Sequence, residues 1–520
     1  MKKILTYSVL FLTSYATMAQ WEANPVDANA TDKTVALYRN LKDIAFTEDQ
    51  FLFGQEFANS YNTSGLSGNP WQSECEDVVG DHPAVLGSDF FYYLKDNGAE
   101  KSTHLTAVQK AYNDFGEGAI ITFDWHMPGP GGNTNHGGTN TSFAYDVVHN
   151  TSNGYYNNDS DGDANKIHGK TPRDWFYDRL KEVRDIINDD LWQYKDGSWH
   201  HIPIVFRLFH EMNGSWFWWG KDDLSAADYI SLYQMTAGFL KSECSTVLFC
   251  WSPDMFYTKA SWGRSKGMDY YPGDDYVDIL GLDAYNIGDA VYPISEFRDQ
   301  MRAMSDNAWN KQKIAVLAET GYKLEGWADF DGSQPWHKPW TGGNYWQDRV
   351  LDALVNDPQQ RASKIAWVLT WINSPWASQP YVSIPSHPNW AKIKLNDFED
   401  ETSTLFASNV PNMYAYTSGA WSRQLGDVAD GENQETDVWS IELSVYPNPT
   451  RGMVNFTFSD HFAEEVAIRL YNGSGQLVLT ETANFSENKT KQLNLSRLTT
   501  GHYYYEVHGS KILRGKLMVR

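Results

Sequence analysis

The sequence predicts a (β/α)₈ TIM barrel followed by a small C-terminal β-sandwich, and three observations support this fold class. Apolar runs with the length of buried strands alternate with helix-like stretches over about 380 residues. Polar side chains able to carry chemistry stand where those runs end, among them Asp89 after the second run and Asp283 at the end of the sixth. After about residue 440 the pattern changes to short alternating strands separated by turn residues.

Each element of the barrel can be assigned from the spacing of its apolar residues. The strands are expected at residues 51–55, 84–90, 119–125, 202–210, 246–251, 277–284, 313–318 and 364–371. Helices are expected from Thr31 onward and at 172–191, 225–241, 295–309 and 345–355. A doubly wound sheet is the alternative, but no expected strand is followed by a glycine-rich phosphate loop.

The length of 520 residues exceeds that of one ordinary domain. Lys2 and Lys3 precede a short apolar stretch and small residues up to Ala19, as in a signal peptide. The expected organisation is a signal peptide at 1–19, a catalytic barrel at 20–416, a linker at 417–440 and a β-sandwich at 441–520. We therefore expect a secreted or cell-surface protein.

Composition excludes some partners and favours others. The formal net charge of −24 argues against nucleic acid and anionic membranes. The 22 Trp and 30 Tyr residues are many, and aromatic faces stack on sugar rings. Cys75, Cys244 and Cys250 lack metal-ligand spacing, and one disulfide is left open. We expect no metal, no cofactor and a monomer.

Two acidic residues at strand ends point to sugar chemistry. Glu211 ends the fourth run, beside the aromatic cluster at 216–219, and Glu319 ends the seventh. Retaining glycosidases use two carboxyl groups about 5–5.5 Å apart. Counting by twos places Arg207, Phe209 and Glu211 on one face of a strand, and Ala315, Leu317 and Glu319 on one face of another.

The stretches RLFHEMNGSWFWWG and LAETG resemble the catalytic signatures of glycoside hydrolase family 26, the β-mannanase family. The resemblance covers about residues 25–416 and implies Glu211 as acid/base and Glu319 as nucleophile. It also implies substrate-binding or orienting roles for His126, His210, Trp216, Tyr285 and Trp371. In these roles Glu211 should have a raised pKa, and Glu319 should stay ionised beside Tyr285 and Arg207.

The resemblance implies a retaining endo-hydrolase of β-1,4-mannosidic bonds. The same barrel could instead release mannobiose from chain ends, or cut mixed-linkage glucan or xylan. A non-catalytic glycan-binding protein is an alternative of another class, although a binder has no need of two glutamates. A GxSxG match at 263–267 has no preceding strand or following helix, so a serine hydrolase is not expected.

The loop at 127–170 is long enough to be a cleft wall or lid. Its acidic stretch at 159–163 resembles half of a calcium loop, but Lys170 stands where the EF-hand glutamate belongs. A solvated acidic loop is therefore preferred, and calcium is left open. Tyr145, Tyr155 and Tyr156 are candidate sugar contacts in this loop.

The C-terminal stretch opens with Tyr446-Pro447-Asn448-Pro449 and ends in a basic, alternating tail at 511–520. It resembles the sorting domain of the bacterial type IX secretion system, which implies the secretion machinery as a partner. A carbohydrate-binding module is the alternative, but no Trp follows Trp439 to stack on a sugar.

Overall fold

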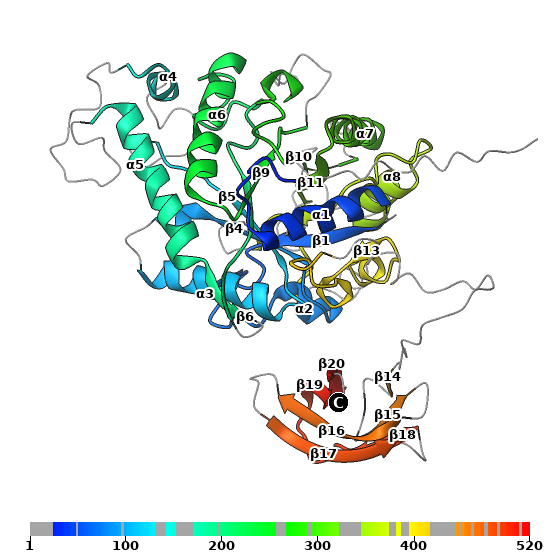
Figure 1. The fold of residues 1–520 in the computed structure, drawn as a ribbon. Coiled ribbons are helices and arrows are strands. Elements are labelled where there is room, and N and C mark those ends of the chain that lie inside the picture. Colours follow the sequence, from blue (N-terminus) through cyan, green and yellow to red (C-terminus); the bar gives the residue numbers. More distant parts are fainter. Residues whose placement is uncertain are drawn as a thin grey trace, which may run out of the picture. The chain divides into compact units, whose positions relative to one another are not determined.

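The structure is a computed structural model, and Figure 1 shows its fold. It describes residues 24–47, 50–94, 98–129, 142–151, 170–195, 198–255, 267–285, 287–288, 293–321, 345–373, 381–385, 395–416, 443–446, 450, 452–458, 462–472, 477–485, 489–508 and 512–519. The chain divides into two compact units, Met1–Gly426 and Asp427–Arg520, which are described separately.

The first unit is a closed parallel barrel with helices outside it, as the sequence predicts (Figure 1). Its eight strands, in order around the barrel, are β1 (Phe51–Glu56), β4 (Val85–Asp89), β5 (Ile120–Asp124), β8 (Ile204–Arg207), β9 (Val247–Trp251), β10 (Ile279–Tyr285), β11 (Ile314–Gly321) and β12 (Trp367–Thr370). Parallel pairing of β12 with β1 closes the ring, and β13 (Thr404–Leu405) adds to β1 outside it.

Helices of four to eighteen residues and two short hairpins surround the strands. They are α1 (Asp32–Thr47), α2 (Glu74–Val79), α3 (Gly98–Asp114), α4 (Phe143–His149), α5 (Pro172–Asp185), α6 (Ala226–Glu243), α7 (Ile294–Lys311) and α8 (Asp352–Val355), with hairpins β2 (Tyr61–Asn62) to β3 (Gly65–Leu66) and β6 (Trp192–Lys195) to β7 (Ser198–His201). Ser225 caps α6 by accepting a hydrogen bond from the Asp228 amide, as the capping pair predicts.

Two predicted helices are correct in place but differ in form. The segment expected at 172–191 is α5 followed by a π-helical turn, Ile186–Asp190. The segment expected at 345–355 begins as a π-helix, Tyr345–Leu351, before α8. Apolar spacing locates a buried helical face but does not distinguish these hydrogen-bond patterns.

The strand predicted at 202–210 is shorter than expected. Strand β8 ends at Arg207, and Phe209 and Glu211 follow with backbone φ angles of 45° and 55°. Because side chains alternate only along extended backbone, counting by twos does not apply after Arg207. Left-handed backbone in non-glycine residues is costly and is typical of functional sites.

The seventh strand is longer than expected. Strand β11 continues to Gly321, so Glu319 lies inside the strand instead of after it. Its register with β10 shifts by one residue at this point: Leu282 pairs with Leu317, but the next residue, Asp283, pairs with Glu319. This bulge-like irregularity also interrupts strict alternation, and such irregularities re-aim side chains beside active sites.

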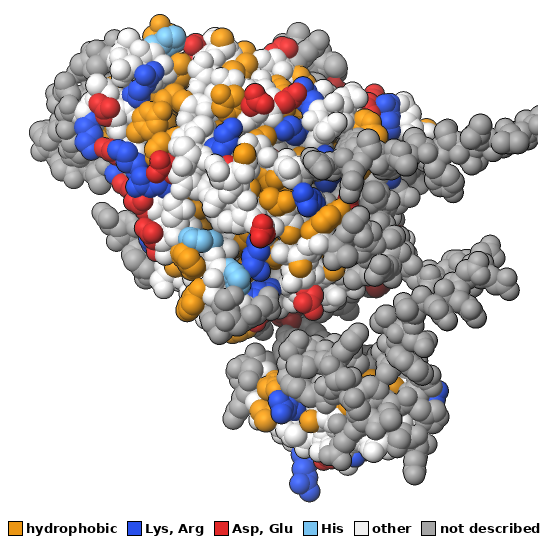
Figure 2. Space-filling model, viewed as in Figure 1, with side chains coloured by type: hydrophobic (Ala, Val, Ile, Leu, Met, Phe, Trp, Pro, Cys, Tyr) orange, Lys and Arg blue, Asp and Glu red, His pale blue; other side chains and the backbone are white. Residues whose placement is uncertain are grey.

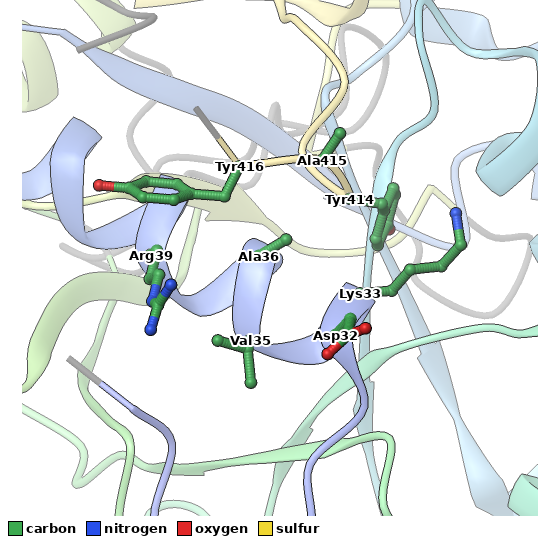
Figure 3. A pocket seen from close by; sticks show the side chains of 8 residues that line it. All are labelled: Asp32, Lys33, Val35, Ala36, Arg39, Tyr414, Ala415 and Tyr416. Atoms are coloured by element: carbon green, nitrogen blue, oxygen red, sulfur yellow. The ribbon is translucent and has the colours of Figure 1, made fainter. Parts of the chain in front are cut away.

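Helix α1 lies across the amino-terminal ends of the strands. The Thr31 amide donates to the Ser245 carbonyl just before β9, and Tyr38 Oη donates to the Gln312 carbonyl just before β11. On the same face, Tyr414 Oη donates to the Ala119 carbonyl before β5. A surface cavity of about 400 Å³ lies between α1 and residues 414–416 (Figure 3). This cavity therefore lies at the end of the barrel opposite the carboxyl ends of the strands.

The second unit contains two antiparallel sheets with one shared core. One sheet has the order β14-β15-β18 and the other β17-β16-β19-β20. Their bounds are β14 (Leu443–Tyr446), β15 (Met453–Phe458), β16 (Phe462–Asn472), β17 (Leu477–Phe485), β18 (Thr490–Asn494), β19 (Gly501–His508) and β20 (Ile512–Val519). Phe456 of the first sheet and Ile468 of the second are buried in the same cluster.

The three cysteines are buried and unpaired, so the structure contains no disulfide. No helix within the described ranges is long and apolar enough to cross a membrane. On the face seen in Figure 2, acidic and basic side chains are interspersed among apolar ones. The signal peptide and linker predictions lie outside the described residues.

Candidate active site

One buried arginine organises the carboxyl ends of the barrel strands. Arg207 donates to Asp124 of β5 at 2.8 Å and to Asp283 of β10 at 2.7 Å, and it also bonds Glu319 of β11. The residue is 3% exposed. Asp124 is the register partner of Arg207, and Asp283 is that of Glu319, so neighbouring strands bring these groups together. Three acidic groups thus converge on one guanidinium.

Both oxygens of Glu319 accept hydrogen bonds. Arg207 donates to Oε2, and the Tyr285 hydroxyl at the end of β10 donates to Oε1. The absence of a side chain at Gly321 lets Tyr381 approach, because a Cβ there would lie 2.4 Å from the Tyr381 ring. These contacts fix the orientation of the Glu319 carboxyl group.

Glu211 faces the same site from the turn after β8. Trp216 Nε1 donates to Glu211 Oε2 at 2.5 Å, and the Glu211 amide donates to the Ser252 carbonyl at 2.9 Å. A Cβ at Gly214 would lie 2.3 Å from the Trp216 ring, so only glycine leaves space for this tryptophan. Trp216, expected as an aromatic of the cleft, therefore contacts Glu211 directly.

The electrostatic surroundings favour a protonated Glu211. Burial raises the pKa of Glu211 to about 8, with further contributions from the Asp254 and Glu319 charges. Arg207 and the hydrogen bond from Trp216 oppose this change. Since the pKa lies above neutral pH, Glu211 can donate a proton there.

Two histidines lie edge to face at the ends of β5 and β8. The rings of His126 and His210 are 4.7 Å apart between centroids, and Trp371 lies 5.7 Å from His126. Burial lowers the pKa of His126, but Asp89, 2.7 Å from Nδ1, outweighs burial and raises it to about 9. Burial, with Arg207 and His126, lowers the pKa of His210 well below its usual range. The pair thus combines one charged and one neutral imidazole.

These histidines also form the one group of described residues with metal-ligand spacing. Asp124, His126 and His210 each offer a ligand atom, and these atoms lie within 4.8 Å of one another. Asp124 already pairs with Arg207, and His126 with Asp89. The set therefore fits a hydrogen-bonded sugar site better than a cation site.

Sequence reasoning missed two acidic residues at strand ends. Glu56 ends β1, and Asp254 follows β9; they are 2% and 4% exposed. The rule that found Asp89 and Asp283, a polar residue at the carboxyl end of a strand, would also have found them. Tyr381, which lies beside Tyr285, carried no such signal because the described strand before it, β12, already ends at Thr370.

Several sequence expectations fall outside the described residues. They concern the acidic stretch at 159–163, Tyr155 and Tyr156, and most of the GxSxG match at 263–267. Tyr145 is described, and it lies exposed on α4 with its ring stacked on His149 at 4.0 Å.

A closed parallel barrel with paired carboxyl groups and aromatic side chains at the carboxyl ends of its strands is typical of barrel glycoside hydrolases. Residues 26–359, more than half of the chain, match the profile described as Glycosyl hydrolase family 26. The chain belongs to this family. Residues 444–520 match a Secretion system C-terminal sorting domain, which confirms the predicted sorting domain and indicates export to the surface or the medium.

Curated relatives carry consistent names. The Mannan endo-1,4-beta-mannosidase of Bifidobacterium adolescentis is 28% identical over 403 residues, covering 74% of this chain and 36% of that protein. That of Bacillus subtilis is 26% identical over 319 residues, covering 58% of this chain and 78% of the relative. A third, from Caldalkalibacillus mannanilyticus, is 28% identical, and the match covers 50% of that protein. The chain thus spans about a third to a half of the length of the first and third of these relatives.

Solved structures share the fold. An endo-beta-1,4-mannanase from Cellulomonas fimi aligns over 95% of this chain and 99% of its own, with a TM-score of 0.59 and 21% identity. A GH26 beta-mannanase from Bacteroides ovatus aligns over 75% and 98%, with a TM-score of 0.57 and 23% identity. At these identities the comparison establishes the barrel fold.

Proposed function

We propose that this chain is an exported, retaining endo-hydrolase of β-1,4-mannosidic bonds in mannans. The observation that carries the proposal is the pairing of Glu319, held by Arg207 and Tyr285, with Glu211, whose pKa is raised. Family membership and the names of the relatives support mannan as the substrate.

In the first step Glu319 attacks the anomeric carbon of the sugar. The bond from this carbon to the glycosidic oxygen breaks, and Glu211 gives its proton to the departing oxygen. In the second step a water attacks the same carbon and transfers its proton to Glu211. The bond from this carbon to Glu319 breaks as the water bonds to the carbon, which regenerates both side chains.

The remaining site residues have supporting roles in this proposal. His126, charged through Asp89, donates a hydrogen bond to a hydroxyl of the bound sugar. Trp371 stacks on the face of the same sugar ring. Tyr285 orients Glu319, and Trp216 orients Glu211 while adding an aromatic face to the cleft. His210 remains neutral and packs against His126, so it holds that ring in place.

Product profiling tests the proposal. The purified protein is incubated with linear mannan, galactomannan, glucomannan, mixed-linkage glucan and xylan, and the products are separated by size. We expect mixed manno-oligosaccharides from the mannans, with the anomeric configuration retained in the first product by NMR. Mannobiose alone would indicate exo action, and preferential cutting of glucan or xylan would reassign the substrate. Binding without turnover would indicate a glycan-binding protein.

A further inference from the structure

Asn373 is a buried amide side chain to which the proposed mechanism gives no role. It follows β12, two residues after Trp371, and is 1% exposed. A buried polar side chain is costly unless its hydrogen bonds are made, so its partners indicate what it holds in place. The inference below rests on the proposed function.

All four hydrogen-bonding positions of the Asn373 side chain are used. Oδ1 accepts from the Tyr381 amide at 2.8 Å and from the Val382 amide at 3.1 Å. Nδ2 donates to the Val382 carbonyl at 3.2 Å and to Glu74 Oε2 at 3.0 Å. Because backbone amides only donate and carbonyl oxygens only accept, these partners also define which end of the side chain is the oxygen. Asn373 therefore fixes the backbone at residues 381 and 382.

Glu74, the acidic partner of Asn373, is itself held in place. It begins α2, and its Oε1 accepts from the Thr63 hydroxyl at 2.7 Å and from the Thr63 amide at 3.2 Å. Thr63 lies in the turn between β2 and β3, in the segment that follows β1. The segments after β1 and after β12 are thus joined at Asn373, and β1 and β12 are the strands that close the barrel.

Tyr381, whose amide Asn373 binds, packs beside Glu319. Its ring lies edge to face with that of Tyr285, with 5.8 Å between the centroids and 70° between the planes. The ring also occupies the space over Gly321, where an added Cβ would overlap it. Gly321 is two residues after Glu319 on β11, and Tyr285 Oη donates to Glu319 Oε1. Asn373 is therefore connected to the proposed nucleophile through one ring contact and one hydrogen bond.

We propose that Asn373 is a positioning residue for Glu319. It holds Tyr381 against Tyr285, and this contact keeps the Tyr285 hydroxyl on the Glu319 carboxyl group. Asn373 does not touch the substrate in this proposal. Because an oriented nucleophile is needed in the transition state, its loss should lower kcat and leave KM nearly as it is.

The test measures kcat and KM of the full chain on linear mannan and on an aryl mannoside. Asn373→Ala releases residues 381 and 382, whereas Tyr381→Ala removes the ring and keeps the bonds from its backbone. Each should lower kcat by about 10- to 100-fold on both substrates, because both substrates need the same nucleophile. KM should change by less than about threefold. Tyr381→Phe keeps the ring and should lose much less kcat than Tyr381→Ala.

A double-mutant cycle tests whether the effect of Asn373 passes through Tyr285. Tyr285→Phe removes the hydroxyl that donates to Glu319. In this background Asn373→Ala should lower kcat by a further factor of about two at most, because no hydroxyl remains to be positioned. Any larger further loss would overturn the proposal.

The matched control is Asn40→Ala. Asn40 is also a buried amide, 3% exposed, and its Nδ2 donates to the Met413 and Ala415 carbonyls at 2.8 and 3.2 Å. It lies on α1, at the opposite end of the barrel. This variant should lower the melting temperature and leave kcat per folded molecule unchanged. It separates the loss of a buried amide from the displacement of Glu319.

Other outcomes also decide. With an active parent, an undiminished kcat in Asn373→Ala, or a loss on mannan alone, would overturn the proposal. If Asn373→Ala does not fold, Tyr381→Ala takes its place in the same measurements and in the cycle. Failure of both variants to fold assigns these residues a purely structural role and also overturns it. A parent inactive on every glycan refutes the proposed function instead, and the inference with it.

Discussion

At the scale of single residues, Glu211 and Glu319 differ in the contacts that they make. Glu319 accepts from a guanidinium and a phenol, as a carboxylate does, whereas burial and acidic neighbours surround Glu211. The two identical side chains thus stand in different environments, which suits them to the separate roles proposed above.

The two glutamates should therefore respond differently to substitution. Glu319→Ala should lower kcat/KM by about 10⁴-fold or more on every substrate, because no nucleophile remains. Glu211→Ala should lower it by about 10²- to 10⁴-fold on mannan but much less on an aryl mannoside with a good leaving group. Steady-state kinetics on both substrates checks this, and equal losses on the two substrates for Glu211→Ala would contradict it.

Glu56 illustrates a second consequence of burial. Its carboxyl group is pressed against Gly87, where a Cβ would lie 2.1 Å away, and Oε2 has no hydrogen-bond partner among the described residues. Burial raises the pKa of Glu56 well above its ordinary value, and Asp124 adds to this while Arg207 opposes it. Between the ordinary and the raised pKa, the folded chain binds more protons than the unfolded chain.

The free energy of unfolding should therefore fall as pH rises through this window, because Glu56 ionises in the folded chain at a cost. Glu56→Gln cannot ionise, so this loss of stability should be absent from the variant. The melting temperature of Glu56→Gln relative to the parent should increase between about pH 5 and about pH 8. Glu117→Gln, at an exposed site, is the control and should show no such trend. A constant difference across this range would exclude a neutral Glu56.

At the scale of elements, the turn after β8 depends on one glycine. Gly214→Ala would place a methyl group against the Trp216 ring and displace the indole that donates to Glu211. We expect kcat/KM on mannan to fall by about 10- to 100-fold, because small displacements at a reacting centre are costly.

The control is Gly238→Ala in α6, where an added Cβ meets nothing within 4 Å. It should leave activity unchanged and stabilise the helix by roughly 0.5–1 kcal/mol. Thermal unfolding and kinetics on both variants check this, and full activity of Gly214→Ala would mean that the Trp216 contact is dispensable.

The same elements explain which parts of the fold and site can be predicted from the sequence. Apolar runs predict the buried strands. Polar residues at the carboxyl ends of these strands then predict most of the site, including Glu211, Asp283 and Glu319. Strand alternation could not place Glu211, because the backbone is left-handed at Phe209 and Glu211, and Glu211 is held by bonds to Ser252 and Trp216. The positions of Asn213 and Tyr381 in the site could not be predicted from the sequence either, since each depends on contacts that only the folded chain makes.

At the scale of the molecule, the barrel closes on itself without the second unit. Asn40 of α1 donates to the Met413 and Ala415 carbonyls at 2.8 and 3.2 Å, and Tyr414 bonds Ala119, so residues 413–415 are fastened to the barrel. Stability of the first unit should therefore require residues up to 416 and not those after 426.

Deleting residues 427–520 should leave kcat/KM and melting temperature of the barrel unchanged, whereas deleting 404–520 should lower the melting temperature. Removing 511–520 alone takes away β20, which pairs with β19 along its length, and should abolish export. Activity assays and fractionation of producing cells check these outcomes. Unimpaired export of the 511–520 deletion would contradict the sorting role.

Tyr416 has a further bearing on how such a hydrolase meets its polymer. It lies beside α1 and lines the cavity there (Figure 3). This cavity is at the end of the barrel opposite the carboxyl ends of the strands, where Glu211 and Glu319 lie. The described part of the first unit therefore ends on the side of the barrel away from the proposed catalytic residues. Under the proposed function, residues 414–416 would thus leave the approach of a mannan chain to Trp216 and Trp371 open.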